Sequence, residues 1–183
     1  MKIGTKSLLI GAHQIFLHPI TVTLAWIELY GLPSWKELIC ICIHDWGYWN
    51  CSDIDGVGQG ADHPFLAARI AYEYLDNNVG WMARGDSYSA LCLYHSREIA
   101  NEYKTKPSKL CWADKLSVKF DPWWLYLPRV ILSGEIKEFR ILAEKLGEVP
   151  NSASNKEWYL WAQKRMIRKA YSMDARPAYE KGS

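Results

Sequence analysis

The amino-acid sequence predicts an all-α protein. Apolar residues recur at helical spacing along most of the 183-residue chain, and no alternating apolar and polar run is long enough to indicate a β-sheet. Two capping-box patterns, Ser34-Trp-Lys-Glu37 and Ser154-Asn-Lys-Glu157, mark helix starts. Because this length suits one domain and 49% of the residues are hydrophobic, we expect residues 1–183 to form a single domain with a substantial core.

Proline, glycine and capping residues delimit the helices predicted for the first half of the chain. Pro19 suits the first turn of a helix, and Gly31 ends that helix. The capping box at Ser34 opens a helix that runs to His44 and Asp45. The predicted elements of this half are helices over residues 5–17, 19–31, 34–45 and about 64–75, the last capped by Asp62 or Ala61 after a loop at 51–62.

Similar signals delimit the helices of the second half. Ser108, after Pro107, starts one helix, and Asp121 reads as an N-cap followed by a favoured proline. Ser133 is expected to start a further helix. The predicted helices span residues 87–100, 107–119, a short aromatic segment from 121, 133–146 and 154–171. We expect a core over about residues 5–146, with the last helix packed on it or used for association as a homo-oligomer.

The charge distribution argues against a dedicated nucleic-acid binder. The net charge is only +2, but residues 155–183 carry seven Lys or Arg against three acidic residues. This segment is therefore +4, and residues 1–154 are −2. The basic last helix is expected to present a solvated face or to meet an anionic partner.

Cysteine usage and hydropathy indicate a reduced, cytoplasmic protein. The five cysteines form no C-x-x-C pair and lie mostly in apolar surroundings, where cysteine acts as a small hydrophobic residue. No apolar run reaches the length of about 18 residues that a membrane-spanning helix needs. We therefore expect no membrane association.

Histidine and aspartate residues occur where buried helical positions are expected. There are five histidines, each in or at the edge of a predicted helix, and Asp45 and Asp114 lie within apolar helical segments. Alone, such a histidine would be a satisfied core residue, and Asp114 could pair with Lys115 or Arg97. Together, they require a shared partner, because a buried carboxylate is costly without a cation or several hydrogen-bond donors. Imidazole and carboxylate ligands suit zinc, iron, manganese or nickel.

The order of these residues resembles the HD-domain superfamily. The pattern is a histidine, a His-Asp pair, two further histidines and a distant aspartate, in the local sequences HPITVTLA, HDWGY and ADKLS. The matching residues are His18, His44, Asp45, His63, His95 and Asp114. The resemblance implies a compact helical bundle that holds one or two divalent ions, such as iron, manganese, zinc, nickel or cobalt. It places the first ion on His18, His44, Asp45 and Asp114, and the second on His63 and His95, with Asp45 bridging.

The resemblance also implies a phosphohydrolase that acts through a metal-activated water on a nucleotide, phosphomonoester or small phosphodiester. Besides Asp45, the candidate catalytic and phosphate-binding residues are Arg97 and Lys115. His13 could replace His18 as the first ligand or contact the substrate, since the two side chains would point about 140° apart on one helix. Tyr48 could donate a hydrogen bond to the substrate.

The sequence departs from many hydrolases of this superfamily just after the His-Asp pair. Many members have Lys or Glu there, whereas this chain has Gly47, Tyr48 and Trp49. Two alternatives therefore stay open. One is a di-iron oxygenase of the same superfamily, and the other is a nucleotide-binding module without catalytic activity.

Overall fold

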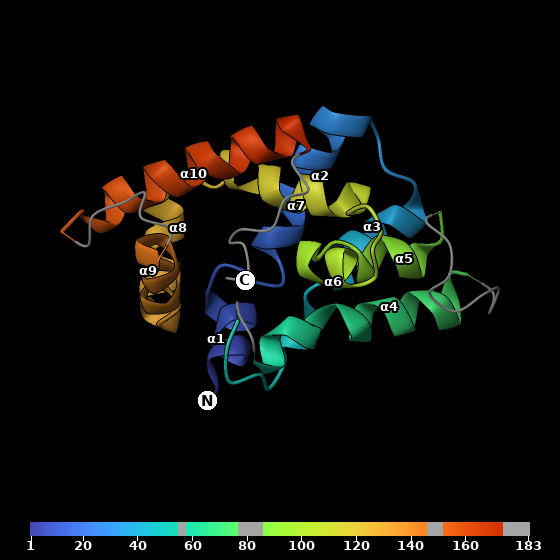
Figure 1. The fold of residues 1–183 in the computed structure, drawn as a ribbon, viewed down its shortest axis with the longest axis horizontal. Coiled ribbons are helices and arrows are strands. Elements are labelled where there is room, and N and C mark those ends of the chain that lie inside the picture. Colours follow the sequence, from blue (N-terminus) through green and yellow to red (C-terminus); the bar gives the residue numbers. More distant parts are fainter. Residues whose placement is uncertain (55–57, 77–85, 146–151, 174–183) are drawn as a thin grey trace.

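The computed structural model describes residues 1–54, 58–76, 86–145 and 152–173 and confirms the all-α prediction, with helices and no strand in these ranges (Figure 1). The α-helices are α1 (Ile3–Ile10), α2 (Leu17–Tyr30), α3 (Trp35–Ile43), α4 (His63–Tyr74), α5 (Tyr88–Leu93), α6 (Arg97–Glu102), α7 (Lys109–Ser117), α8 (Trp123–Ser133), α9 (Ile136–Lys145) and α10 (Asn155–Ser172). Three short 3₁₀ helices are η1 (Trp46–Tyr48), η2 (Gln59–Asp62) and η3 (Val118–Phe120). None of the helices in the described ranges combines the length and apolar character needed to cross a bilayer.

Two long helices lie on opposite sides of the molecule. In Figure 1, α10 runs along the upper edge and α4 along the lower right, with α3, α5 and α7 between them and one end of α2 reaching the upper edge. α2 packs on α7, α4 packs on α5, and α10 packs on α7 and α8. The main core lies between these helices and includes the buried residues Val22, Trp26, Ile41, Leu93, Leu110 and Leu116. A second core joins α8, α9 and α10 and includes Leu127, Val130, Ile136, Trp158 and Tyr159.

Both predicted capping boxes are present. The Ser34 hydroxyl accepts a hydrogen bond from the Glu37 backbone N–H, and the Glu37 carboxylate accepts one from the Ser34 N–H. Ser154 and Glu157 make the same reciprocal pair at the start of α10. These contacts satisfy backbone donors that would otherwise lack partners at the helix starts.

Two predicted helices are shorter than expected. The helix predicted over residues 5–17 ends at Ile10, because the N–H of Ala12 donates to the Glu135 carboxylate, 3.0 Å from Oε2, instead of continuing the helix. The helix predicted over 87–100 is two helices, α5 and α6. Ser96 is extended between them, and its hydroxyl accepts a hydrogen bond from the Ile99 N–H, which caps α6. Both breaks place a histidine, His13 or His95, outside a helix.

Two predicted helix starts in the second half are wrong. Ser133 is the last residue of α8, and Gly134 separates it from α9 with a φ of 91°, in the left-handed region that glycine adopts readily. Asp121 does not cap α8. Its carboxylate pairs instead with Arg129, and Pro122 occupies the N-cap position.

Helix α4 begins at His63, with Asp62 at its N-cap position and no side-chain capping bond. The predicted end at Leu146 lies outside the described residues.

Candidate metal centre

Five segments of the chain contribute the six predicted ligands to one place. His18 lies in the first turn of α2, and His44 and Asp45 follow directly on α3. The other three come from the start of α4, the break between α5 and α6, and the middle of α7: His63, His95 and Asp114. Residues up to 96 positions apart therefore meet, because α2 packs on α7 and α4 on α5.

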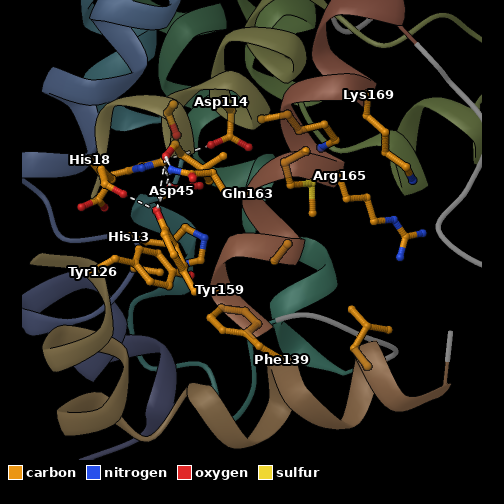
Figure 2. A pocket seen from close by; sticks show the side chains of 18 of the residues that line it. His13, His18, Asp45, Asp114, Tyr126, Phe139, Tyr159, Gln163, Arg165 and Lys169 are labelled. Atoms are coloured by element: carbon orange, nitrogen blue, oxygen red, sulfur yellow. Dashed lines mark hydrogen bonds and ion pairs between the residues drawn. The ribbon is translucent and has the colours of Figure 1, made fainter. Parts of the chain in front are cut away.

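The first group comprises His18, His44 and Asp114 around one oxygen of Asp45. The Nε2 atom of His18 lies 3.2 Å from Asp45 Oδ2, 3.1 Å from Asp114 Oδ1 and 3.3 Å from His44 Nε2. His44 Nε2 lies 3.1 Å from the same Asp45 oxygen. Figure 2 shows His18, Asp45 and Asp114 converging at one end of a pocket.

The second group faces the other oxygen of Asp45. His63 Nε2 and His95 Nε2 lie 3.7 Å and 3.6 Å from Asp45 Oδ1 and only 2.9 Å from one another. Asp45 is therefore the residue that the two groups share, with one carboxylate oxygen directed to each.

Backbone carbonyls orient three of the histidines. The Nδ1 atoms of His44, His63 and His95 lie 2.8, 2.7 and 2.5 Å from the carbonyl oxygens of Ile41, Gly60 and Cys92. Because a carbonyl oxygen only accepts, each Nδ1 carries a hydrogen, and each Nε2 lone pair is directed into the cluster. This is the orientation that metal-ligating histidines usually have.

The arrangement fits a cation better than a hydrogen-bonded network. The Nε2 lone pairs of the histidines point toward the carboxylate oxygens. The buried Asp45 Oδ2 accepts no hydrogen bond from the described residues. Two ligand atoms about 2.1 Å from one ion lie roughly 3.0 Å apart at a right angle and about 3.4 Å apart at the tetrahedral angle. Separations of 3.1 to 3.3 Å in the first group and the 2.9 Å between His63 and His95 fall near these values. His44 and Asp114 are farther apart, at 3.9 Å, and Asp45 Oδ1 lies 3.6 to 3.7 Å from the two histidines of the second group. Two sets of these side chains, His18 with His44 and Asp114, and His44 with Asp45 and His95, could therefore hold a metal ion.

Burial and the short distances between these side chains also shift the pKa values of His63, Asp114 and His44. Burial and the neighbouring His95 lower the pKa of His63 to about 3. Burial would raise the pKa of Asp114, but contacts with His18 and His44 hold it well below its usual range. The pKa of His44 is raised well above its usual value, since attraction to Asp45 and Asp114 outweighs the effect of burial.

Two structural contacts position His63. Its ring stacks on that of Tyr48 with centroids 3.9 Å apart and an angle of 15° between the planes. A Cβ atom built on Gly47 would lie 2.0 Å from the carbonyl oxygen of His63, so only glycine allows this approach. Gly47 and Tyr48, which follow the His-Asp pair closely, therefore both contact a predicted ligand.

A cavity of about 260 Å³ opens beside the two groups. The predicted cations Arg97 and Lys115 line it, and Arg97 is only 4% exposed. The opposite wall comes from α8, α9 and α10. The side chains there include Tyr126, Phe139, Trp158, Tyr159, Gln163, Arg165 and Lys169 (Figure 2).

His13 and Tyr48 also line the cavity but lie outside the two groups. His13 Nδ1 lies 2.8 Å from the Ser7 hydroxyl, whereas the His18 ring reaches Asp45 and Asp114. The geometry therefore favours His18 over His13 as the first ligand. Tyr48 is 3% exposed and packs between His13 and His63, so its main contact is with site residues.

Sequence reasoning missed two parts of the site. It recognised that the last helix is basic but did not assign Arg165 and Lys169 to the cavity, because only the packing of α10 on α7 and α8 brings them there. It also missed Glu135, a fully buried acid behind His13. An acidic residue just after a Ser-Gly pair carries no local signal of burial.

Comparison with known proteins adds no assignment. No family model, curated protein or solved structure matches the chain.

Proposed function

We propose that this protein is a metal-dependent phosphohydrolase of the HD-domain type, acting on a nucleotide, phosphomonoester or small phosphodiester. The observation that carries the proposal is the division of the Asp45 carboxylate between two histidine groups. Its Oδ2 lies 3.1 Å from His44 Nε2, and its Oδ1 lies 3.6 Å from His95 Nε2. A carboxylate in this position can bridge two cations.

The donor set indicates which ions would fit. His18, His44 and Asp114 with Asp45 would hold one ion, and the remaining two histidines with Asp45 would hold the other. Mixed imidazole and carboxylate ligands suit iron, manganese, zinc, nickel or cobalt. When bound, such ions make water more acidic and offset the charge on a phosphoryl group.

The charges along the cavity support an anionic substrate. Arg97 and Lys115 lie near the ligand residues, and Arg165 and Lys169 extend from α10 on the side away from them (Figure 2). The guanidinium groups can bind phosphate oxygens in a bidentate manner, and the lysines act as point charges. Aromatic side chains such as Tyr126 on the opposite wall could contact a base or another flat group.

Elemental analysis and a hydrolysis panel test the proposal together. Protein purified without chelator should contain transition metal, and the metal-loaded protein should hydrolyse at least one nucleotide, phosphomonoester or phosphodiester. Asp45→Asn should lose both properties. Asp86→Asn, at an exposed aspartate before α5, is the matched control and should retain both.

The outcomes separate the alternatives. Bound iron with oxygen consumption and no hydrolysis of any ester would favour the oxygenase. Nucleotide binding without turnover would favour a binding module. Failure of the wild-type protein to bind any transition metal, even after reconstitution, would contradict both enzymatic functions.

A further inference from the structure

A buried carboxylate lies behind His13, outside the two candidate metal groups. Glu135, just before α9, is 0% exposed. Its Oε1 accepts a hydrogen bond from the Ser7 hydroxyl at 2.5 Å, and its Oε2 accepts hydrogen bonds from the Ala12 N–H at 3.0 Å and from the Ser133 hydroxyl. Burial would raise the pKa of Glu135, but its contacts with His13, Ser133 and Ser7 hold it below the usual value. The carboxylate is therefore ionised.

Two features of the backbone at positions 11 and 12 accommodate the Glu135 carboxylate. A Cβ atom built on Gly11 would lie 1.9 Å from Glu135 Oε2, so a larger residue would collide with the acid. The turn after α1 also gives the Ala12 N–H to Glu135 instead of to a helix carbonyl. Because burying a charge is costly, and apolar packing can often replace a buried ion pair without loss of stability, a role beyond stability is expected.

The hydrogen bonds between these residues have a defined direction. Ser7 has one hydroxyl hydrogen, which it donates to Glu135. The Ser7 oxygen lies 2.8 Å from His13 Nδ1, so it must accept the hydrogen carried by that nitrogen. The same Nδ1 lies 3.7 Å from Glu135 Oε1. The order of donors and acceptors therefore runs from His13 through Ser7 to Glu135.

The other edge of the His13 ring lies at the cavity. The side chain of His13 is 18% exposed, lines the cavity and packs edge-on to His18 with ring centroids 5.6 Å apart. Figure 2 shows it between the ligand residues and Tyr126. Because Nδ1 faces the buried Ser7, Nε2 is the nitrogen on the cavity side.

We propose that Glu135 is a positioning residue that acts through Ser7 to hold His13 in one tautomer, with the Nε2 lone pair presented to the cavity. The group that His13 recognises is then a hydrogen-bond donor, such as a water or a hydroxyl group of the ligand, beside the candidate metal centre. The identity of this donor rests on the proposed function. The tautomer of His13 does not.

Nitrogen NMR of the zinc-loaded protein tests the tautomer directly. Long-range ¹H–¹⁵N correlation distinguishes protonated from unprotonated ring nitrogens, and the His13 signals are those that His13→Gln removes. In the wild type, Nδ1 should be protonated and Nε2 unprotonated. In Ser7→Ala and Glu135→Gln, hydrogen should appear on Nε2, while Glu102→Gln, at an exposed acid of α6, should resemble the wild type.

Kinetics with p-nitrophenyl phosphate and bis-p-nitrophenyl phosphate provide the second measurement. Ser7→Ala should lower kcat on the order of 10-fold to 100-fold, with KM and zinc content nearly unchanged, since it misplaces a group without removing a ligand. Ser7→Ala removes only a hydroxyl group. If Glu135→Gln does not fold, Ser7→Ala therefore still tests whether His13 is positioned through Ser7.

The two proposals can fail separately. Protonation of Nε2 in the wild type, or an unchanged His13 tautomer in folded Ser7→Ala, would overturn the positioning role of Glu135. Absence of hydrolysis with the expected tautomer would overturn the phosphohydrolase and leave the His13 arrangement established. Loss of activity in Ser7→Ala together with loss of zinc would also overturn the positioning role.

Discussion

Gly47 contacts the backbone of His63 so closely that a Cβ atom at position 47 would lie 2.0 Å from the His63 carbonyl oxygen. The same Cβ would lie 2.6 Å from the His63 Cα atom. These atoms belong to the backbone at the start of α4, so a rotamer change cannot relieve the collision. The residue two positions after the His-Asp pair thus determines where a member of the second histidine group lies.

Gly47→Ala should therefore reduce metal binding by the second group. Overpacking against backbone costs about 1–3 kcal/mol of unfolding free energy and shifts His63 away from His95. Elemental analysis should show loss of one metal equivalent, and denaturant unfolding should show reduced stability. Gly31→Ala is the control, because Gly31 has a φ of 83° and no atom within 4 Å of an added Cβ. It should lower stability without changing metal content, and equal metal loss in both variants would contradict the explanation.

The two groups should lose their ions separately. Asp114 Oδ1 lies 3.1 Å from His18 Nε2 of the first group, and His95 Nε2 lies 2.9 Å from His63 Nε2 of the second. Asp114→Ala and His95→Gln should therefore each retain about half of the wild-type metal. Spectroscopy of the cobalt-loaded variants should show different remaining sites. Complete metal loss in both variants would indicate one shared ion instead of two.

The stability contribution of Glu135 should depend on pH. Its pKa is lower in the folded protein than in the unfolded chain, despite burial, because His13, Ser133 and Ser7 stabilise the ionised form. A group with a lowered folded pKa stabilises the protein above its unfolded pKa of about 4.5, and this contribution is lost as the pH falls through the folded pKa. The difference in unfolding free energy between wild type and Glu135→Gln should thus be largest near pH 7 and shrink below about pH 4.5. Urea unfolding at several pH values measures it, and a difference that grows on acidification would contradict this sign.

Arg165 should affect substrate affinity more than metal content. It lines the cavity from α10 and is not among the ligand residues. Arg165→Gln should raise KM for a phosphate ester roughly 10-fold to 150-fold, as expected for loss of a charge-assisted hydrogen bond of about 1.5–3 kcal/mol. Steady-state kinetics at low ionic strength, with metal analysis of the same sample, would test this. Arg168→Gln, at an exposed position of α10 outside the cavity lining, is the matched control.

The helical class was accessible from the sequence for physical reasons, and the meeting of the six residues was expected from the resemblance. Capping boxes and helical spacing are local signals, and both predicted capping boxes are present. The His-Asp pair at the end of an apolar helix signalled a buried charge in need of a partner. The resemblance then supplied the order of the other ligand residues, and the helix packing brings them together.

The parts that were missed depend on contacts between distant segments. The early end of α1 at Ile10 depends on Glu135, which is more than 120 positions away. The break at His95 depends on Ser96 taking an extended conformation between two short helices. Neither Glu135 nor the cavity-facing Arg165 has a neighbouring residue that reveals its position. Local sequence signals therefore could not locate them.

The cavity has walls from two separate stretches of the chain. The candidate ligand residues all lie between positions 18 and 114, whereas the aromatic and basic side chains opposite them come from α8, α9 and α10. The candidate ligand residues and the side chains of the opposite wall thus come from successive blocks of the chain. Randomisation confined to the cavity-lining positions of α8, α9 and α10 should yield variants that bind different ligands but retain the metal content of the wild type. Natural divergence of such a protein toward new substrates could follow the same route, with the amino-terminal block held constant.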